Sequence, residues 1–526
     1  MHRFTHLLII LGLAGSGLAG LSGCAATQTS QPQATPVKKS DKQLSLEHPE
    51  QQAPQQLSAI ATHDNVWDRI VDAYRLNIDI ENPRITSQLN WYKSHQSYMN
   101  RMADRGVRYL HFIAEQIEVR EIPGEIALLP IVESAFDPFA YSHGRASGVW
   151  QFIPATGRDF GLQQDWWHDG RRDIRASTEA ALRYLHALQR EFKGDWLLAL
   201  AAYNSGAGTV RKAIRKNRKQ GKPTDFWSLS LPRETRAYVP KLIALAKLVR
   251  DAEQYGISVK PVANEPYFAV VDTGGQIDLS QAAELADTDL EEIYKLNPEY
   301  NRWATHPQGP HELLIPVDKK AVFEQQLAAL PANSRVKWQR YKVRPGDNLL
   351  TIARRFHTTP SALKQSNNLR GSVIRAGDQL LIPSAFKGQQ AYSHSAPQRL
   401  ARLKNARQPS NTQKSEYSVR SGDSFWQIAR NHDVKVSELA RWNGMAPGDP
   451  LKAGQKLVIW SKKAKPSQRE IIRKVNYKVR NGDSLARIAQ KFGVRVSDIR
   501  RWNSTKTNNK YLQPGQRLTL YIDVTR

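Results

Sequence analysis

A glutamate at the end of an apolar run is the residue of this chain best placed for acid–base chemistry. Glu133 follows the apolar residues 127–132, which predict a buried helix with Pro123 in its first turn. Pro138 disfavours a longer helix, so we expect Glu133 near the helix C-terminus. Apolar neighbours and the negative end of the helix dipole both disfavour a charged carboxylate there. We therefore expect a raised pKa and a general-acid role, with simple capping or pairing within the fold as the structural alternative.

Three strings of residues after Glu133 could build a site around it. They are Gly148-Val149-Trp150-Gln151-Phe152-Ile153-Pro154, then Ala201-Ala202-Tyr203-Asn204-Ser205-Gly206-Ala207-Gly208, and finally Glu234-Thr235-Arg236-Ala237-Tyr238-Val239. For Tyr203 and Asn204, helix packing and turn formation are the structural alternative. The aromatic residues of these strings are either ring-stacking surfaces for a sugar or ordinary core residues.

The elements that must position these residues are helices. Apolar residues recur at helical spacing from Val66 onward, and further helices are expected at about 177–193, 195–203, 208–219 and 233–254. The sequence between residues 65 and 255 shows no strand-like alternation of any length. This pattern predicts a mainly α domain over residues 63–258.

The first 62 residues resemble a targeting segment followed by a tether. Cys24 is the single cysteine of the 526 residues, which excludes an intramolecular disulfide. The string Leu21-Ser22-Gly23-Cys24, after an apolar stretch, resembles a lipobox. That resemblance implies a lipoprotein signal peptide at 1–24, lipidation of Cys24 and, with Ala25 next, anchoring to the outer membrane on its periplasmic side. An ordinary signal peptide is the alternative. Residues 25–62 are poor in aliphatic residues, which predicts a flexible tether.

Positive charge is concentrated in the C-terminal third. The net charge is +27, and residues 335–526 hold 39 Lys and Arg against 11 Asp and Glu, whereas residues 1–334 hold 37 against 38. Such a region could meet nucleic acid, anionic lipid or an anionic cell-wall polymer. The lipobox argues against nucleic acid, so a wall polymer is the expected partner.

A motif of about 43 residues occurs three times in that region. The string Tyr341-Lys342-Val343-Arg344-Pro345-Gly346-Asp347 returns as Tyr417-Ser418-Val419-Arg420-Ser421-Gly422-Asp423 and as Tyr477-Lys478-Val479-Arg480-Asn481-Gly482-Asp483. The copies span 341–383, 417–460 and 477–521, and each predicts strand, helix, helix, strand, with the Gly-Asp turn capping the first helix. The polar segments 384–416 and 461–475 predict linkers on which the copies move independently.

These repeats resemble LysM modules, which are small βααβ domains. The resemblance implies binding of N-acetylglucosamine-containing glycans in a shallow groove between two loops. The groove residues that it implies are Gly346, Asp347 and Asn367; Gly422, Asp423, Ser424 and Asn443; and Gly482, Asp483, Ser484 and Asn503. A helix N-cap is the structural alternative for each aspartate. Segment 259–332 resembles a degenerate LysM module with a structural role.

The strings around Glu133 resemble those of the soluble lytic transglycosylase domain, which has a goose-type lysozyme-like fold. The resemblance covers about residues 105–250, and the order of lipobox, catalytic domain and LysM array resembles that of membrane-bound lytic transglycosylases. It implies cleavage of the MurNAc-β-1,4-GlcNAc bond of peptidoglycan without water. The sequence shows no zinc or phosphate motif, so we expect no cofactor or metal. Glu133 would be the catalytic acid and base, and Ser142, Gln151, Tyr203 and Asn204 would bind substrate.

Three other functions stay open from the sequence. A hydrolytic muramidase would need a second carboxylate, such as Asp137 or Asp173, on the opposite face of the sugar. A peptidoglycan anchor without catalysis would need only the binding surfaces. A nucleic-acid binder would fit the charge, but the chain lacks an interleaved recognition motif.

Overall fold

The structure is a computed structural model of the chain. It describes residues 63–142, 144–356, 358–406, 411–462, 472–503 and 512–523. The expected signal peptide at 1–24, the lipidation site Cys24 and the tether at 25–62 lie outside the described residues.

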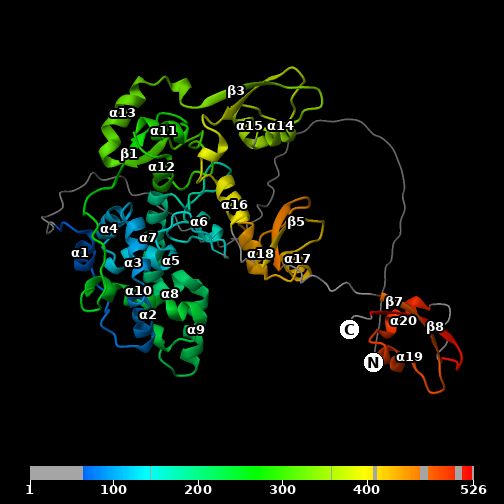
Figure 1. Cartoon of the computed structure of the whole chain (residues 1–526). Coiled ribbons are helices and arrows are strands. Elements are labelled where there is room, and N and C mark those ends of the chain that lie inside the picture. The colour runs from blue at the N-terminus through cyan, green and yellow to red at the C-terminus, as the bar shows by residue number, and fades with distance from the viewer. Residues whose placement is uncertain are drawn as a thin grey trace, which may run out of the picture. The chain divides into compact units, whose positions relative to one another are not determined.

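Glu133 belongs to an N-terminal helical domain, whose helices are coloured blue to green in Figure 1. It consists of α1 (Val66–Asp72), α2 (Pro83–Lys93), α3 (Gln96–Gly106), α4 (Leu110–Glu118), η1 (Gly124–Leu128), α5 (Leu129–Ser134), α6 (Pro154–Asp159), α7 (Ile174–Glu191), α8 (Trp196–Ser205), α9 (Ala207–Lys219), η2 (Phe226–Ser228) and α10 (Arg233–Arg250). The described residues of this domain form no strand, in agreement with the sequence analysis. Side-chain caps start several of the helices: Asp173 accepts the Ala176 N–H and Asp195 accepts the Leu198 N–H.

Helix α10 is the centre of this domain. It contacts α1, α2, α5 and α8, and most of its apolar residues between Val239 and Val249 are buried. A helix that is apolar on nearly all sides is stable only when other helices cover it, and α10 is covered in this way. Its first turns bring Glu234 and Tyr238 towards α5.

The run before Glu133 forms two short helices rather than the one that the sequence predicts. Pro123 is the N-cap of the 3₁₀ helix η1, and α5 begins only at Leu129. Pro130 explains the break, because it has no N–H to donate to a carbonyl four residues earlier. The prediction that Glu133 lies near a helix C-terminus is confirmed, since α5 ends at Ser134.

A βααβ segment follows the helical domain and packs against it. It comprises β1 (Phe268–Asp272), α11 (Leu279–Leu285), α12 (Leu290–Leu296) and β2 (Glu312–Pro316), and it is followed by η3 (Val317–Lys319), α13 (Lys320–Ala329) and η4 (Ala332–Ser334). Strands β1 and β2 pair antiparallel. Two hydrogen bonds of 2.7 Å join the Arg108 guanidinium to the Glu292 carboxylate, and Tyr109 donates to the Lys295 carbonyl at 2.7 Å. The segment is therefore bound to the helical domain by polar contacts.

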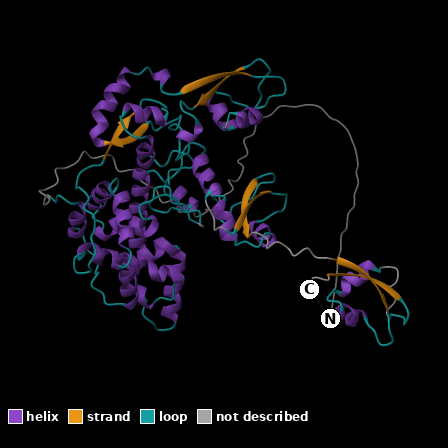
Figure 2. Cartoon of the chain, viewed as in Figure 1, coloured by secondary structure: helices purple, strands orange, loops and turns teal. Residues whose placement is uncertain are grey.

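Three more βααβ modules follow, as the repeats predict. The first has β3 (Lys337–Lys342), α14 (Leu349–Arg355), α15 (Pro360–Ser366) and β4 (Gln379–Ser384). The second has β5 (Thr412–Ser418), α17 (Phe425–Asn431), α18 (Val436–Trp442) and β6 (Lys456–Lys462), and the third has β7 (Ile472–Lys478), α19 (Leu485–Lys491), α20 (Val496–Trp502) and β8 (Arg517–Asp523). In the described part of the chain, all strands belong to four two-stranded antiparallel sheets (Figure 2).

The segment expected to be a flexible linker at 384–416 is partly folded instead. It contains η5 (Gln389–Ala391) and α16 (Ala396–Asn405), and Tyr392 is 1% exposed. The Tyr392 hydroxyl bonds to the Asp278 carboxylate at 2.9 Å, and the Phe386 N–H donates to the same carboxylate at 2.9 Å. Composition could not reveal this contact because one buried tyrosine within a polar sequence supplies it. We call residues 385–405 the strap.

Candidate active site and glycan-binding modules

Glu133 lies at a sharp turn between buried apolar residues. Ala135 and Phe136 both adopt left-handed backbone conformations, with φ of 51° and 54°, so the chain reverses directly after the catalytic helix. Ile131 and Phe136 are buried on either side of the glutamate. Burial of the carboxyl group raises the pKa of Glu133 to about 7. The raised pKa predicted from the sequence is thus confirmed, with burial as its leading cause.

Tyr238 on α10 holds the Glu133 carboxyl group. Its hydroxyl donates a hydrogen bond to Oε1 of Glu133, and burial keeps the pKa of Tyr238 well above its usual value, so that it stays a donor. This bond favours the charged carboxylate, whereas the nearby charge of Glu234 disfavours it. A carboxyl group balanced near neutral pH can both release and accept a proton. Sequence reasoning treated Tyr238 only as a possible ring-stacking residue and missed this polar contact, although its string had been singled out.

Tyr203 and Gln151 shape the loop beside Glu133. The Tyr203 hydroxyl donates to the Trp150 carbonyl at 2.8 Å, and the Gln151 amide donates to the Gly148 carbonyl at 2.8 Å. Burial and the charge of Glu133 raise the pKa of Tyr203 well above its usual value. A Cβ atom at Gly148 would lie 2.2 Å from the Arg171 carbonyl oxygen, so only glycine fits there.

Ser142 and Asn204 also make contacts within the domain. The Ser142 hydroxyl accepts the N–H groups of Gly144 and Ala146, which leaves its own proton to donate. The Asn204 side-chain oxygen accepts a bond from the Thr235 hydroxyl at 2.8 Å, which ties α8 to α10. Both residues therefore serve the fold, and both keep a donor for a ligand, namely the Ser142 hydroxyl proton and the Asn204 side-chain amide N–H groups.

The two carboxylates considered for a hydrolytic mechanism are used locally. Asp137 accepts the Phe139 N–H at 3.0 Å in the turn after α5. Asp173 caps α7 by accepting the Ala176 N–H at 2.8 Å. Each of these bonds gives its carboxylate a role in the fold.

A buried cluster of charges supports the site, and the sequence analysis missed it. Asp169 pairs with both Arg171 and Arg172. Arg171 also donates to the Arg145 carbonyl at 2.6 Å and the Phe152 carbonyl at 3.2 Å, so it fixes the loop that contains Gln151. The Gly170-Arg171-Arg172-Asp173 string is the signal that could have pointed to it.

In each repeat the aspartate of the Gly-Asp turn accepts hydrogen bonds from residues of the same module. Asp347 accepts the Tyr341 hydroxyl and the Arg344 N–H, and the equivalent residues Asp423 and Asp483 make the same two bonds. The aspartates are not the helix N-caps that the structural alternative supposed. The next residue is the N-cap in every copy, namely Asn348, Ser424 and Ser484.

The asparagines expected in the glycan groove bond within their own modules. Asn443 is 3% exposed, donates to the Leu439 and Val458 carbonyls and accepts the Val458 N–H. Asn367 and Asn503 make the same three bonds in their modules, at 2.7–3.0 Å. In each module this amide therefore serves the fold; Asn443 and Asn503 are buried, and Asn367 is half-buried. A contact of these residues with sugar stays a prediction.

Comparison with known proteins decides the family. Residues 112–226 match the transglycosylase SLT domain, residues 267–332 match the LysM-like domain of lytic transglycosylase MltD, and residues 341–383, 417–460 and 477–520 match the LysM domain. Membrane-bound lytic murein transglycosylase D of Escherichia coli K12 is 37% identical over 412 residues, which cover 75% of this chain and 86% of that protein. The chain belongs to the membrane-bound lytic murein transglycosylase D family.

Other relatives match shorter parts of this transglycosylase. A putative tributyltin chloride resistance protein of an Alteromonas species is 41% identical over 140 residues, which is 27% of this chain and 63% of that one. The probable peptidoglycan endopeptidase LytE of Bacillus subtilis is 33% identical over 180 residues, which is 33% of this chain and 48% of that one.

Family membership confirms the resemblance drawn from the strings around Glu133 and from the repeats. The protein is a peptidoglycan lytic transglycosylase with a helical catalytic domain followed by LysM modules.

Proposed function

We propose that this transglycosylase breaks the MurNAc-β-1,4-GlcNAc bond of peptidoglycan without water and leaves 1,6-anhydro-MurNAc ends. The observation that carries the proposal is one carboxyl group, Glu133, that has a pKa of about 7 and a tyrosine bound to it. Hydrolysis needs a second carboxylate to activate water or to attack the sugar. The two carboxylates considered for that role, Asp137 and Asp173, serve a turn and a helix cap.

One carboxyl group is enough for the proposed reaction. Glu133 gives its proton to the glycosidic oxygen as the bond from that oxygen to C1 of MurNAc breaks. The C6 hydroxyl oxygen of the same MurNAc then bonds to C1, and its proton passes to the Glu133 carboxylate. Glu133 returns to its starting state, and no water is consumed. Because the nucleophile belongs to the same sugar ring, its effective concentration is high.

Neighbouring residues position this carboxyl group and the substrate. Tyr238 holds Oε1 of Glu133, which leaves the other carboxyl oxygen to face the glycosidic oxygen. The Ser142 hydroxyl donates to the glycan, and the Gln151 amide oxygen accepts from it. Tyr203 and Asn204 act through the loop and the helix that they hold in place.

The LysM modules hold the enzyme on the glycan. Since the aspartates and asparagines bond within their own modules, we assign sugar contacts to the backbone of the turns at Gly346, Gly422 and Gly482 and to the exposed residues after them. Trp426 is 60% exposed two residues after Ser424 and offers the second module a ring for stacking on a sugar. Several weak modules on one chain lengthen its residence on the wall.

We also propose that the protein is a lipoprotein of the outer membrane that faces the periplasm, anchored through Cys24. The lipobox string and Ala25 support this proposal. Within the described ranges, none of the helices combines the length and apolar character that crossing a membrane requires.

Mass spectrometry of the products tests the reaction. Purified full-length protein and its Glu133→Gln variant would be incubated with isolated sacculi. We expect anhydro-muropeptides from the wild-type protein and a loss of at least about a thousandfold in the variant, because the acid and the base are the same group.

Two other results would each replace the proposal. Reducing MurNAc ends would mean hydrolysis and a second carboxylate or bound water that acts on the sugar. Binding to sacculi with no cleavage product would mean that the protein is an anchor.

A further inference from the structure

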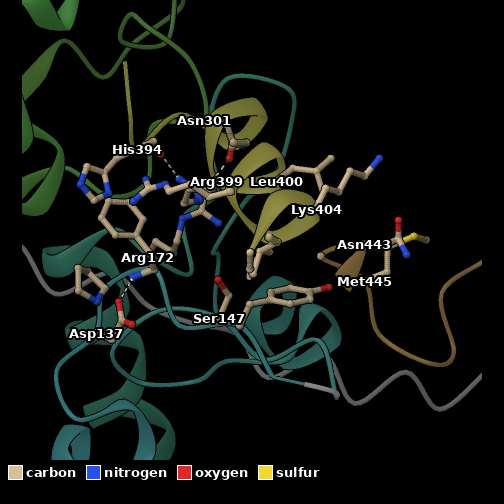
Figure 3. Close-up of a pocket in the computed structure, with 18 of the residues that line it drawn as sticks. Asp137, Ser147, Arg172, Asn301, His394, Arg399, Leu400, Lys404, Asn443 and Met445 are labelled. Carbon is tan, nitrogen blue, oxygen red and sulfur yellow. Dashed lines mark hydrogen bonds between the residues drawn. The ribbon is translucent and has the colours of Figure 1, made fainter. Parts of the chain in front are cut away.

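A positively charged cavity lies next to the catalytic helix. Its volume is about 1730 Å³, and the residues that carry the argument are Phe139, Arg172, His394, Arg399 and Arg402. Phe139 follows α5 in the chain, Arg172 belongs to the buried charge cluster, and the other three belong to the strap. Figure 3 shows the guanidinium groups of Arg172 and Arg399 side by side below α16. The cavity is separate from the Glu133 carboxyl group, which does not line it.

Arg399 is a cation without a matching anion. Its guanidinium lies over the Phe139 ring at 5.0 Å and donates to the His394 carbonyl. Among the described residues, no carboxylate lies within ion-pair distance of it. Burial and the charge of Arg172 lower the pKa of Arg399 to about 9. A half-buried cation without a counter-ion is stabilised by an anion that enters the cavity.

The other charges around the cavity do not neutralise Arg399. Arg402, one turn later on α16, donates to the Ser393 carbonyl and has no carboxylate partner within the described part of the chain. Nine lysines and arginines line the cavity against two aspartates, of which Asp104 pairs with Lys260 and Asp137 accepts a neutral N–H, that of Phe139. The cavity therefore keeps an excess of positive charge.

We propose that this cavity binds carboxylate groups of the peptides that MurNAc carries in peptidoglycan. This inference rests on the proposed function, because the peptide arrives on the glycan that Glu133 cleaves. Phe139 is six residues after Glu133, so the two lie at most about 20 Å apart, and a peptide of four or five residues spans about 13–18 Å. Arginine forks bind carboxylates with two parallel bonds, and the Phe139 ring fixes the plane of one fork.

The test compares two substrates that differ only in their peptides. Glycan strands with peptides and strands stripped by an amidase would be given to the full-length protein, and the ratio of the two kcat/KM values would be measured. We expect Arg399→Gln to lower this ratio about tenfold, as loss of a charge-assisted bond does, and Arg399→Lys to lower it less. Arg302→Gln is the matched control. Arg302 also lies over an aromatic ring, Trp166, without a carboxylate partner in the described residues, but it does not line the cavity.

A second measurement does not depend on cleavage. Calorimetry would follow the binding of a soluble stem tetrapeptide to full-length Glu133→Gln protein. We expect binding that is lost when Arg399→Gln is added or when the carboxylates of the peptide are amidated.

The inference fails if Arg399→Gln leaves the substrate ratio unchanged, or if Arg302→Gln lowers the ratio equally. It also fails if the amidated peptide binds as well as the acidic one, or if vesicles of anionic phospholipid bind through Arg399 and the peptide does not. If the wild-type protein cleaves neither substrate, the proposed function fails instead, and calorimetry still decides the peptide site.

Discussion

Two residues one turn apart on α10 act on the Glu133 carboxyl group in opposite directions. The Tyr238 hydroxyl stabilises the carboxylate by a hydrogen bond, and the charge of Glu234 destabilises it. Burial exceeds both influences, so the proton is held until about pH 7. Glu133 can thus act as an acid and as a base at one pH, because burial and its two neighbours together set its pKa near 7.

The pH profile of cleavage should respond to these two residues with opposite signs. Since Glu133 must begin protonated, we expect kcat/KM to fall as the pH rises through about 7. Glu234→Gln removes a negative charge that raises the pKa, so the falling limb should move to lower pH. Tyr238→Phe removes a bond that lowers the pKa, so the limb should move to higher pH. Shifts of equal sign in the two variants would contradict this account.

Glu133 should also lower the free energy of unfolding above neutral pH. A carboxyl group with a folded pKa of about 7 and an ordinary value of 4.5 holds its proton more tightly in the folded state. The contribution of the protonated Glu133 to the free energy of unfolding is present in full below pH 4.5 and is lost as the pH rises through about 7. We expect Glu133→Gln to gain about 2–3 kcal/mol over wild type between pH 4 and pH 8 in denaturant unfolding. Glu179→Gln, at an exposed glutamate of α7, should show no such gain.

At the scale of elements, one asparagine joins helix to strand in every βααβ unit. Asn297 of the LysM-like segment donates to the Ile293 and Leu314 carbonyls and accepts the Leu314 N–H. Asn367, Asn443 and Asn503 make the equivalent bonds in the three LysM modules. The LysM-like segment has lost the Gly-Asp turn but has kept this asparagine, so the asparagine serves the fold.

Removing this asparagine should loosen one module. Asn443→Ala leaves the buried Val458 N–H and two carbonyls without partners, and we expect β6 to lose about 2–4 kcal/mol of protection. This loss of protection is measured by hydrogen exchange of the full-length protein, followed in the peptide that contains Val458. Ser424→Ala removes only a helix cap and should cost about 1 kcal/mol. Unchanged exchange in β6 after Asn443→Ala would show that the amide is dispensable.

The sequence predicted the elements better than the contacts between them. Helical periodicity located α7 to α10, and the repeated strings located the three modules, because both patterns are local. The role of Asn443 in the fold was not predicted because spacing shows that a residue recurs but not which way its side chain points. Tyr238 was misread for the same reason, since its partner Glu133 lies 105 positions away.

At the scale of the whole molecule, Asp278 links three parts of the chain. Its N–H donates to the Arg335 carbonyl, just before the first LysM module, and its carboxylate accepts the Phe386 N–H just after that module. Tyr392 of the strap adds a further bond to the carboxylate. The first module is therefore tied at both of its ends to the LysM-like segment.

Loss of the Tyr392 hydroxyl should release the strap. Tyr392→Phe removes the bonds to the buried Asp278 carboxylate, and we expect proteolysis within 385–405 to become about tenfold faster, which corresponds to about 1.4 kcal/mol. Limited proteolysis with mass spectrometry locates the cuts. Tyr341→Phe removes a similar tyrosine–aspartate bond inside the first LysM module and should not expose the strap. Equal protection of the strap in wild type and Tyr392→Phe would show that packing alone holds it.

The two ends of the first LysM module lie next to each other, and this bears on how the number of modules in such an array can change. Lys337 and Ser384 are opposite each other at the open end of its sheet, so the chain enters and leaves this module at one place. An in-frame deletion between them would remove a whole module and still let Arg335 and Phe386 reach Asp278. Copies could thus be gained or lost here over evolution without re-routing the chain that follows.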